Sequence, residues 1–176
     1  MAINYVVPGI IVPIRQRSSM SCWAAMYTMM YSWKHRMSIP VETAVAGLGQ
    51  HYLDVYHRDT GLSIADNRNL ARAAGMTAEP LQNWTVEGWA GLLRRHGLLW
   101  TSYAWQTATR SGRHIIIFYG LRHDAARGQR VLYVDPADGN RHEMPFLRAV
   151  AQHELGFTIT TLSDALLGQF SQVIHY

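Results

Sequence analysis

Two strand-like runs in the second half of the chain restrict the fold more than any other feature. The first, residues 114–121, follows a glycine turn and is rich in β-branched and aromatic residues, as is typical of a buried strand. The second, residues 130–135, ends in an acid followed by a Pro-Ala-Asp-Gly turn. Because a short polar loop joins the runs, the simplest pairing is an antiparallel hairpin. The start of the first strand then lies beside the end of the second, so we expect His114 and Asp135 to meet.

Helical patterns dominate the chain before these strands. Ser63 is placed to cap a helix over residues 64–74, and Thr85 is placed to cap another over residues 86–96, each with a glycine after it. Residues 50–57 have no clear period, and we expect them to be irregular. The other expected helices cover residues 22–34, a stretch ending near residue 46, and residues 145–153.

The order of the elements predicts the fold class. Besides the hairpin, strand patterns occur at residues 5–14, 99–105, 140–144 and 169–175. Helices first and strands second is the α+β pattern, in which a helical half packs on an antiparallel sheet half. We therefore predict a single domain over residues 1–176, with the active-site cleft between the two halves.

The composition fits one packed domain and argues against several classes of partner. The chain has 176 residues, of which 48% are hydrophobic and 16% charged, so it can bury a substantial core and does not resemble a disordered protein. The net charge is +4, but the arginines are scattered, and no dense basic run indicates a nucleic-acid partner. No apolar run approaches the length of a membrane span, and the first residues lack a secretory-signal pattern, so we expect no membrane partner.

Cys22 is the only cysteine in the sequence. It cannot form an intrachain disulfide or a multi-thiolate zinc site, which leaves the roles of buried filler or nucleophile. A helical pattern starts at this residue, with Ser19 or Ser21 as a plausible N-cap. A sulfur in the first turn faces unpaired backbone N–H groups and the positive end of the helix dipole, which favour the reactive thiolate.

A set of short motifs resembles the papain-like cysteine peptidases of clan CA. The motifs are Gln16 with Cys22-Trp23-Ala24-Ala25, then Gly112-Arg113-His114, then Asp135-Pro136 with Gly139. The resemblance is greatest to the bacterial branch that includes effector proteases injected into plant cells. Residues 97–100, Gly-Leu-Leu-Trp, also resemble a Gly-Pro-Leu-Trp stretch of that branch, with leucine in place of proline. The resemblance extends from about residue 10 to residue 145.

The resemblance implies a role for each of four residues. Cys22 would be the nucleophile, His114 the general base and acid, and Asp135 the group that orients the histidine. Gln16 would contribute to the oxyanion hole together with the backbone N–H of Cys22. From the residues alone, Asp138 remains an alternative to Asp135. We expect no cofactor and no metal, because His51, Asp54 and His57 lack a further ligand at a metal-binding spacing.

The resemblance also implies a biological setting. It predicts a monomeric cysteine endopeptidase that acts on selected proteins, as a bacterial effector or interbacterial toxin. Such a protein would be cytoplasmic in the producing cell and delivered to a target cell by a specialised secretion system, and it could be matched by a cognate immunity or inhibitor protein. A single thiol in a reducing cytosol fits this expectation.

Three alternatives remain open at the level of sequence. A peptidoglycan amidase or a leader peptidase would use the same chemistry on another substrate. Transglutaminase-type acyl transfer would use the same triad with an amine in place of water. An inactive papain-like binding module belongs to a different class, and the complete set of Gln16, Cys22, His114 and Asp135 argues against it.

Overall fold

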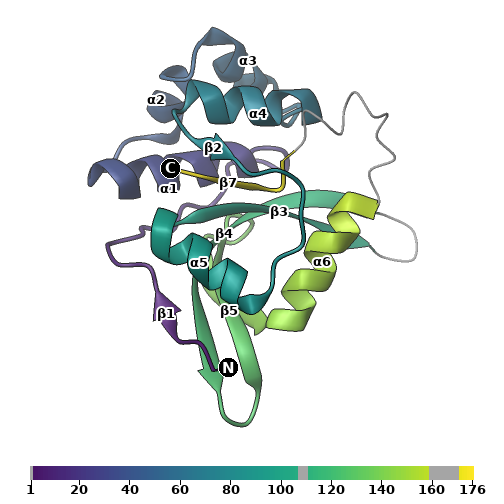
Figure 1. The fold of residues 1–176 in the computed structure, drawn as a ribbon. Helices are drawn as coiled ribbons and strands as arrows, with labels where there is room; N and C mark the ends of the chain where they lie inside the picture. The colour runs from purple at the N-terminus through teal and green to yellow at the C-terminus, as the bar shows by residue number, and fades with distance from the viewer. Residues whose placement is uncertain (1, 107–110, 159–170) are drawn as a thin grey trace.

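An antiparallel sheet of seven strands occupies the middle of the computed structural model, which describes residues 2–106, 111–158 and 171–176 (Figure 1). The strands are β1 (Tyr5–Val6), β2 (Thr77–Ala78), β3 (Leu99–Gln106), β4 (Ser111–Asp124), β5 (Gly128–Asp135), β6 (Asn140–Pro145) and β7 (Val173–His175). The helices are α1 (Cys22–His35), α2 (Val41–Ala46), α3 (Gln50–Arg58), α4 (Ile64–Ala73), α5 (Val86–His96) and α6 (Phe146–Thr158). This arrangement confirms the predicted α+β class.

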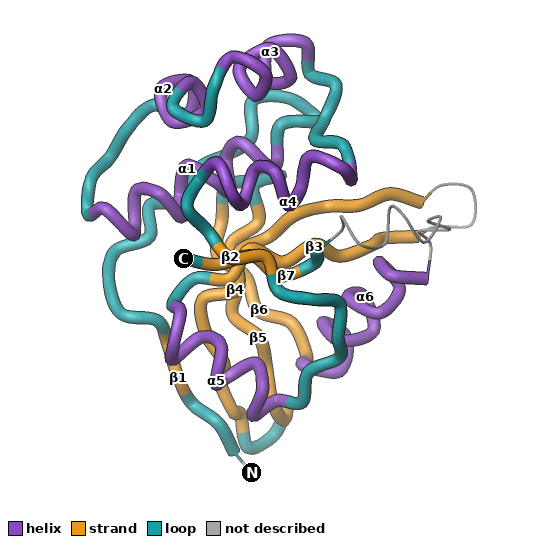
Figure 2. The backbone as a smooth tube through the Cα atoms, turned by 45° about the horizontal axis from the view of Figure 1, so that its top comes forward, coloured by secondary structure: helices purple, strands orange, loops and turns teal. Residues whose placement is uncertain are grey.

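The sheet combines a meander with one non-sequential insertion. Its order is β2-β7-β3-β4-β5-β6, and β1 pairs with β4 outside this path. Helices α1 to α4 lie together on one side of the sheet, whereas α5 and α6 lie on the other (Figure 2). Gly120 lets β1 pair closely with β4, since a Cβ atom there would come within 2.8 Å of the Tyr5 carbonyl oxygen.

Most of the expected helices form, and two of the predicted caps are present. The side chain of Ser63 accepts a hydrogen bond from the Asp66 N–H at the start of α4, and the side chain of Thr85 accepts one from the Gly88 N–H at the start of α5. The last predicted helix begins one residue later than expected and extends to Thr158 as α6.

The prediction that residues 50–57 are irregular is wrong, because these residues form α3. Its apolar stripe is short: only Tyr52, Val55 and Tyr56 are buried, at the i, i+3 and i+4 spacing of a helix. Tyr52 and Tyr56 both pack their rings against Trp23 of α1. The helix therefore depends on a tertiary contact that the local pattern does not reveal.

The first strand is shorter than the expected range of residues 5–14, since β1 contains only Tyr5 and Val6. Pro8 and Pro13 lack the N–H groups that a longer ladder would need. The carbonyl of Pro8 instead accepts a hydrogen bond from Nε1 of Trp33, at 2.9 Å. The last strand is Val173–His175, and residues 169 and 170 of the expected strand lie outside the described residues.

Helix α1 is the centre of the core. Every residue from Trp23 to Met30 is buried, so the helix is covered on all sides and not along a single stripe. It contacts α2 on one side and β3 and β4 on another. Its first residue, Cys22, is half-buried and is therefore held at the edge of this core.

Replacing Gly97 by alanine is expected to destabilise the fold more than replacing Gly75. Both glycines have positive φ angles, 80° and 67°, which alanine adopts at a cost of about 1 kcal/mol. A Cβ atom at Gly97 would also overlap the Trp33 ring, whereas a Cβ atom at Gly75 would meet nothing within 4 Å. Overpacking adds roughly 1–3 kcal/mol for Gly97→Ala alone. Urea unfolding of both variants measures the difference, and equal losses would contradict the close contact with Trp33.

Candidate active site

Cys22 opens α1, but the predicted capping of this helix by a serine side chain does not occur. Ser21 occupies the N-cap position without a side-chain cap hydrogen bond. Its hydroxyl group instead accepts a hydrogen bond from the Ser18 N–H at 3.0 Å and donates one to the Ser18 carbonyl oxygen at 3.0 Å. The N–H of Ala24 donates to the carbonyl oxygen of Ser21 at 3.2 Å, so the first-turn N–H groups left without a capping side chain beside the sulfur are those of Cys22 and Trp23.

His114 and Asp135 meet as the hairpin predicts. Nε2 of His114 lies 2.6 Å from Oδ1 of Asp135, and both side chains are largely buried. The N–H of Ala137 also donates to this carboxylate oxygen, at 2.8 Å. Asp138, the alternative, is bonded to Nε2 of His142 at 2.8 Å instead. The structure therefore brings Asp135, and not Asp138, to the histidine.

The environment of His114 favours its charged form. Burial lowers the pKa of the imidazole, but hydrogen bonds with Asp135 and Cys22 and their negative charges outweigh burial and raise the pKa to about 9. Burial raises the pKa of Asp135, but the hydrogen bonds from His114 and Ala137 bring it below its usual range. Because Nε2 faces Asp135, Nδ1 is the ring nitrogen that remains for Cys22. The three side chains together form a connected row of thiol, imidazole and carboxylate.

Gln16 links the loop before α1 to the turn after Asp135. Its backbone N–H donates to the carbonyl oxygen of Pro136 at 2.7 Å. Its side-chain Nε2 donates to the carbonyl oxygen of Ser18 at 2.7 Å, while Oε1 is buried without a hydrogen-bond partner. An amide nitrogen carries two N–H donors, so one of them remains after the bond to Ser18 is made.

Asp59 supports the same loop, although no pattern in the sequence predicts this role. This residue caps the C-terminal end of α3 in the left-handed conformation, with φ of 51°. Its Oδ1 accepts hydrogen bonds from the hydroxyl of Ser18 at 2.5 Å and from the N–H of Met20 at 3.3 Å. The carboxylate thereby holds the residues that lead into Cys22. Since residues 50–57 were expected to be irregular, no pattern pointed to an acid at this position.

A small recess lies beside the histidine. The ring of Tyr103 meets that of His114 edge-on, with the ring centroids 5.6 Å apart. Tyr103 also lines a cavity of about 220 Å³ together with Tyr133, Arg148 and other side chains of β5, β6 and α6. Burial, together with the charge of Asp135, raises the pKa of Tyr103, which keeps its hydroxyl group protonated. The recess offers room for part of a ligand next to the imidazole.

The three residues considered for a metal site do not converge. His51 pairs with Asp66 at 3.3 Å, and His57 pairs with Glu42 at 2.7 Å. Asp54 accepts a hydrogen bond from the amide of Gln50 within the same helix. Each of the three therefore has a separate partner.

Comparison with known proteins identifies a family that matches most of the chain. The family described as papain-like cysteine protease AvrRpt2 matches residues 6–153, a range that includes all four predicted site residues. Comparison with the curated proteins finds no match. Within the part of the chain that the structure describes, no helix is both long enough and apolar enough to cross a membrane.

We expect the imidazole of His114 to titrate near pH 9 and Asp135→Asn to lower its pKa, because the variant removes a hydrogen-bonded negative charge. The pKa in the folded protein lies above the ordinary 6.5. The pairing of His114 therefore adds fully to the free energy of unfolding below about pH 6.5. This contribution is lost as the pH rises through about 9. An NMR titration of the histidine ring carbons measures the pKa.

Asp138→Asn is the matched control for this titration. Asp138 contacts His142, so its substitution should leave the pKa of His114 unchanged. A wild-type His114 that titrates at its ordinary value, or equal shifts in the two variants, would contradict the pairing with Asp135.

Proposed function

The chain belongs to the family of the papain-like cysteine protease AvrRpt2, and from this premise we propose that Cys22, His114 and Asp135 are its catalytic triad. Membership makes the protein a cysteine protease, a hydrolase of peptide bonds. The observation that carries the assignment is the row formed by a half-buried thiol at a helix start, an imidazole and a carboxylate, with the last two 2.6 Å apart. This is the arrangement that nucleophilic catalysis requires.

In the acylation step, the Cys22 thiolate attacks the carbonyl carbon of the scissile peptide bond. The C–S bond forms, the carbonyl π electrons move onto oxygen, and a tetrahedral oxyanion results. The imidazolium of His114 then donates its Nδ1 proton to the leaving nitrogen as the C–N bond breaks. A raised pKa suits this step, because the histidine carries the proton at neutral pH before the substrate arrives.

In the deacylation step, neutral His114 takes a proton from water, and the resulting hydroxide attacks the thioester. The C–S bond breaks, the acid product leaves and the thiolate–imidazolium pair is restored. Asp135 accepts the Nε2–H throughout, which fixes the ring with Nδ1 toward the sulfur and stabilises its positive charge. The Ala137 N–H holds the carboxylate in place.

We assign the role of binding the oxyanion to the side chain of Gln16 and the backbone N–H of Cys22. The remaining Nε2–H of Gln16 is a neutral donor, so it can stabilise developing negative charge without quenching the thiolate. Its bonds to Ser18 and Pro136 support the assignment, because a donor that is already oriented needs little rearrangement during the reaction.

The setting that we propose is that of an effector. The protein would act on selected proteins of a target cell after delivery from the producing cell, and the producing cell could hold a cognate inhibitor. Membership in a protease family favours hydrolysis over acyl transfer and over an inactive binding module. The recess lined by Tyr103 and Arg148 supports selectivity for side chains that fit it, because Tyr103 also contacts His114.

Adding the wild-type protein to a cell extract is expected to create new protein N-termini that the Cys22→Ala variant does not create. Without the sulfur no acyl-enzyme can form, but the variant should still fold, because Cys22 lies at the edge of the core. Labelling of N-termini followed by mass spectrometry identifies the cleaved bonds. Asp138→Asn, outside the triad, should give the wild-type set of cleavages. Identical N-termini with wild type and Cys22→Ala would refute proteolysis by this thiol.

Gln16→Ala is expected to lower kcat by about 10²-fold or more while KM stays nearly constant, because the lost donor faces charge that exists only in the transition state. Its melting temperature should stay close to wild type, since the backbone bond to Pro136 does not need the side chain. Kinetics on a cleaved substrate peptide and thermal unfolding are measured together. Gln50→Ala is the control, since it removes an amide that only bonds within α3. An unchanged kcat would remove Gln16 from the site, and a large loss of stability would make its role structural.

A further inference from the structure

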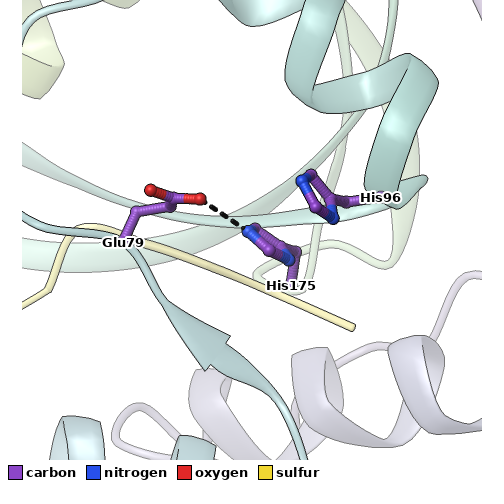
Figure 3. Close-up of side chains that lie close together, drawn as sticks. All are labelled: Glu79, His96 and His175. Carbon is purple, nitrogen blue, oxygen red and sulfur yellow. Dashed lines mark hydrogen bonds and ion pairs between the residues drawn. The ribbon is translucent and has the colours of Figure 1, made fainter.

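Glu79, His96 and His175 lie close together in a cluster (Figure 3). The cluster is at the β2–β7 edge of the sheet, whereas Asp135 ends β5 near the opposite edge. Glu79 directly follows β2, His96 ends α5 and His175 ends β7. Oε1 of Glu79 lies 2.9 Å from Nε2 of His175, and the rings of His96 and His175 are stacked with centroids 3.7 Å apart. One ligand atom from each residue lies within 4.8 Å of the other two.

Two imidazole nitrogens and a carboxylate oxygen are a ligand set that zinc accepts, with water in the fourth position. Ligand atoms around tetrahedral zinc lie roughly 3.4 Å apart, so the cluster must contract slightly to bind the ion. His175 and Glu79 are held by burial, with 3% and 19% of their side chains exposed. His96 is more accessible and ends a helix, so its ring can turn out of the stack to complete the site.

The surroundings of the two rings suit metal binding. Nδ1 of His175 lies 3.3 Å from the main-chain oxygen of Tyr176, and His96 is also hydrogen-bonded to the backbone of Tyr176. A backbone acceptor on one ring nitrogen fixes the tautomer and leaves the other nitrogen free to bind a metal.

A buried histidine satisfied by one acid does not explain the whole cluster. The bond to Glu79 alone would satisfy Nε2 of His175. The pair of His57 and Glu42 shows a histidine bonded to one acid alone, in an exposed position, with the same kinds of groups 2.7 Å apart. The cluster differs because His96, at the end of α5, joins the pair of Glu79 and His175 as a third possible ligand. Within the described residues, no other group of three or more such ligands is found.

We propose that Glu79, His96 and His175 bind one divalent transition-metal ion of the zinc type. The ion would join the end of α5 to the β2–β7 edge of the sheet and stabilise the fold in its bound state. The site does not share a residue with the thiol, imidazole and carboxylate row, so the proposal is independent of the proposed function.

Titration of the metal-free Cys22→Ala protein with ZnCl2 tests the proposal. This background removes the thiol, which could bind zinc on its own, and the protein must carry no histidine tag. Calorimetry in a buffer without phosphate should show one equivalent of zinc, and the melting temperature should rise as zinc is added. Adding His96→Ala or Glu79→Gln should weaken binding by at least about 10-fold. Cobalt bound to the same site should give visible absorption that these variants lose.

His57→Ala is the matched control, because it removes a histidine that pairs with a single acid. Its zinc affinity should equal that of the Cys22→Ala parent. His96 is the principal test position because it is partly exposed, so the metal-free variant should melt at the temperature of its parent. Absence of saturable zinc binding by the parent would overturn the proposal, and so would binding that both His96→Ala and Glu79→Gln retain.

Discussion

A backbone hydrogen bond joins the two halves of the site: the N–H of Gln16 donates to the carbonyl oxygen of Pro136 at 2.7 Å. Cys22, the proposed nucleophile, comes from the helical half, and His114 and Asp135 come from the sheet half. The site therefore depends on how the halves are held together. The contact is close enough that Gly139 must lack a side chain, since a Cβ atom there would lie 2.9 Å from the backbone nitrogen of Arg15. The loop before Cys22 and the turn after Asp135 are therefore held as one unit.

The parts of the site that the sequence predicts are those that local rules determine. A hairpin with a short loop fixes which residues meet, so the contact between His114 and Asp135 follows from the strand pattern alone. The choice between Asp135 and Asp138 did not follow from the pattern, because both acids flank the same turn. The structure separates them through their partners, His114 for the first and His142 for the second.

The parts that the sequence does not predict depend on contacts between distant segments. Asp59 reaches Ser18 across 41 positions, and Glu79 reaches His175 across 96. No spacing rule covers such separations, because they arise only when the elements pack. Helix α3 was missed although Tyr52, Val55 and Tyr56 stand at helical spacing. Three residues make a short pattern, and the packing of two of them on Trp23 cannot be seen in the local sequence.

The absence of a side-chain cap on α1 connects stability with the proposed chemistry. A capping serine typically stabilises a helix by about 1 kcal/mol, and Ser21 stands at the right position to provide this. Its hydroxyl group binds Ser18 instead, in the loop that Asp59 also holds. Helix α1 tolerates the loss because it is buried on all sides, so tertiary packing and not capping stabilises it. The same serine thus orders the loop that carries Gln16 and leaves the N–H groups of Cys22 and Trp23 beside the sulfur, where the proposed thiolate and oxyanion would need them.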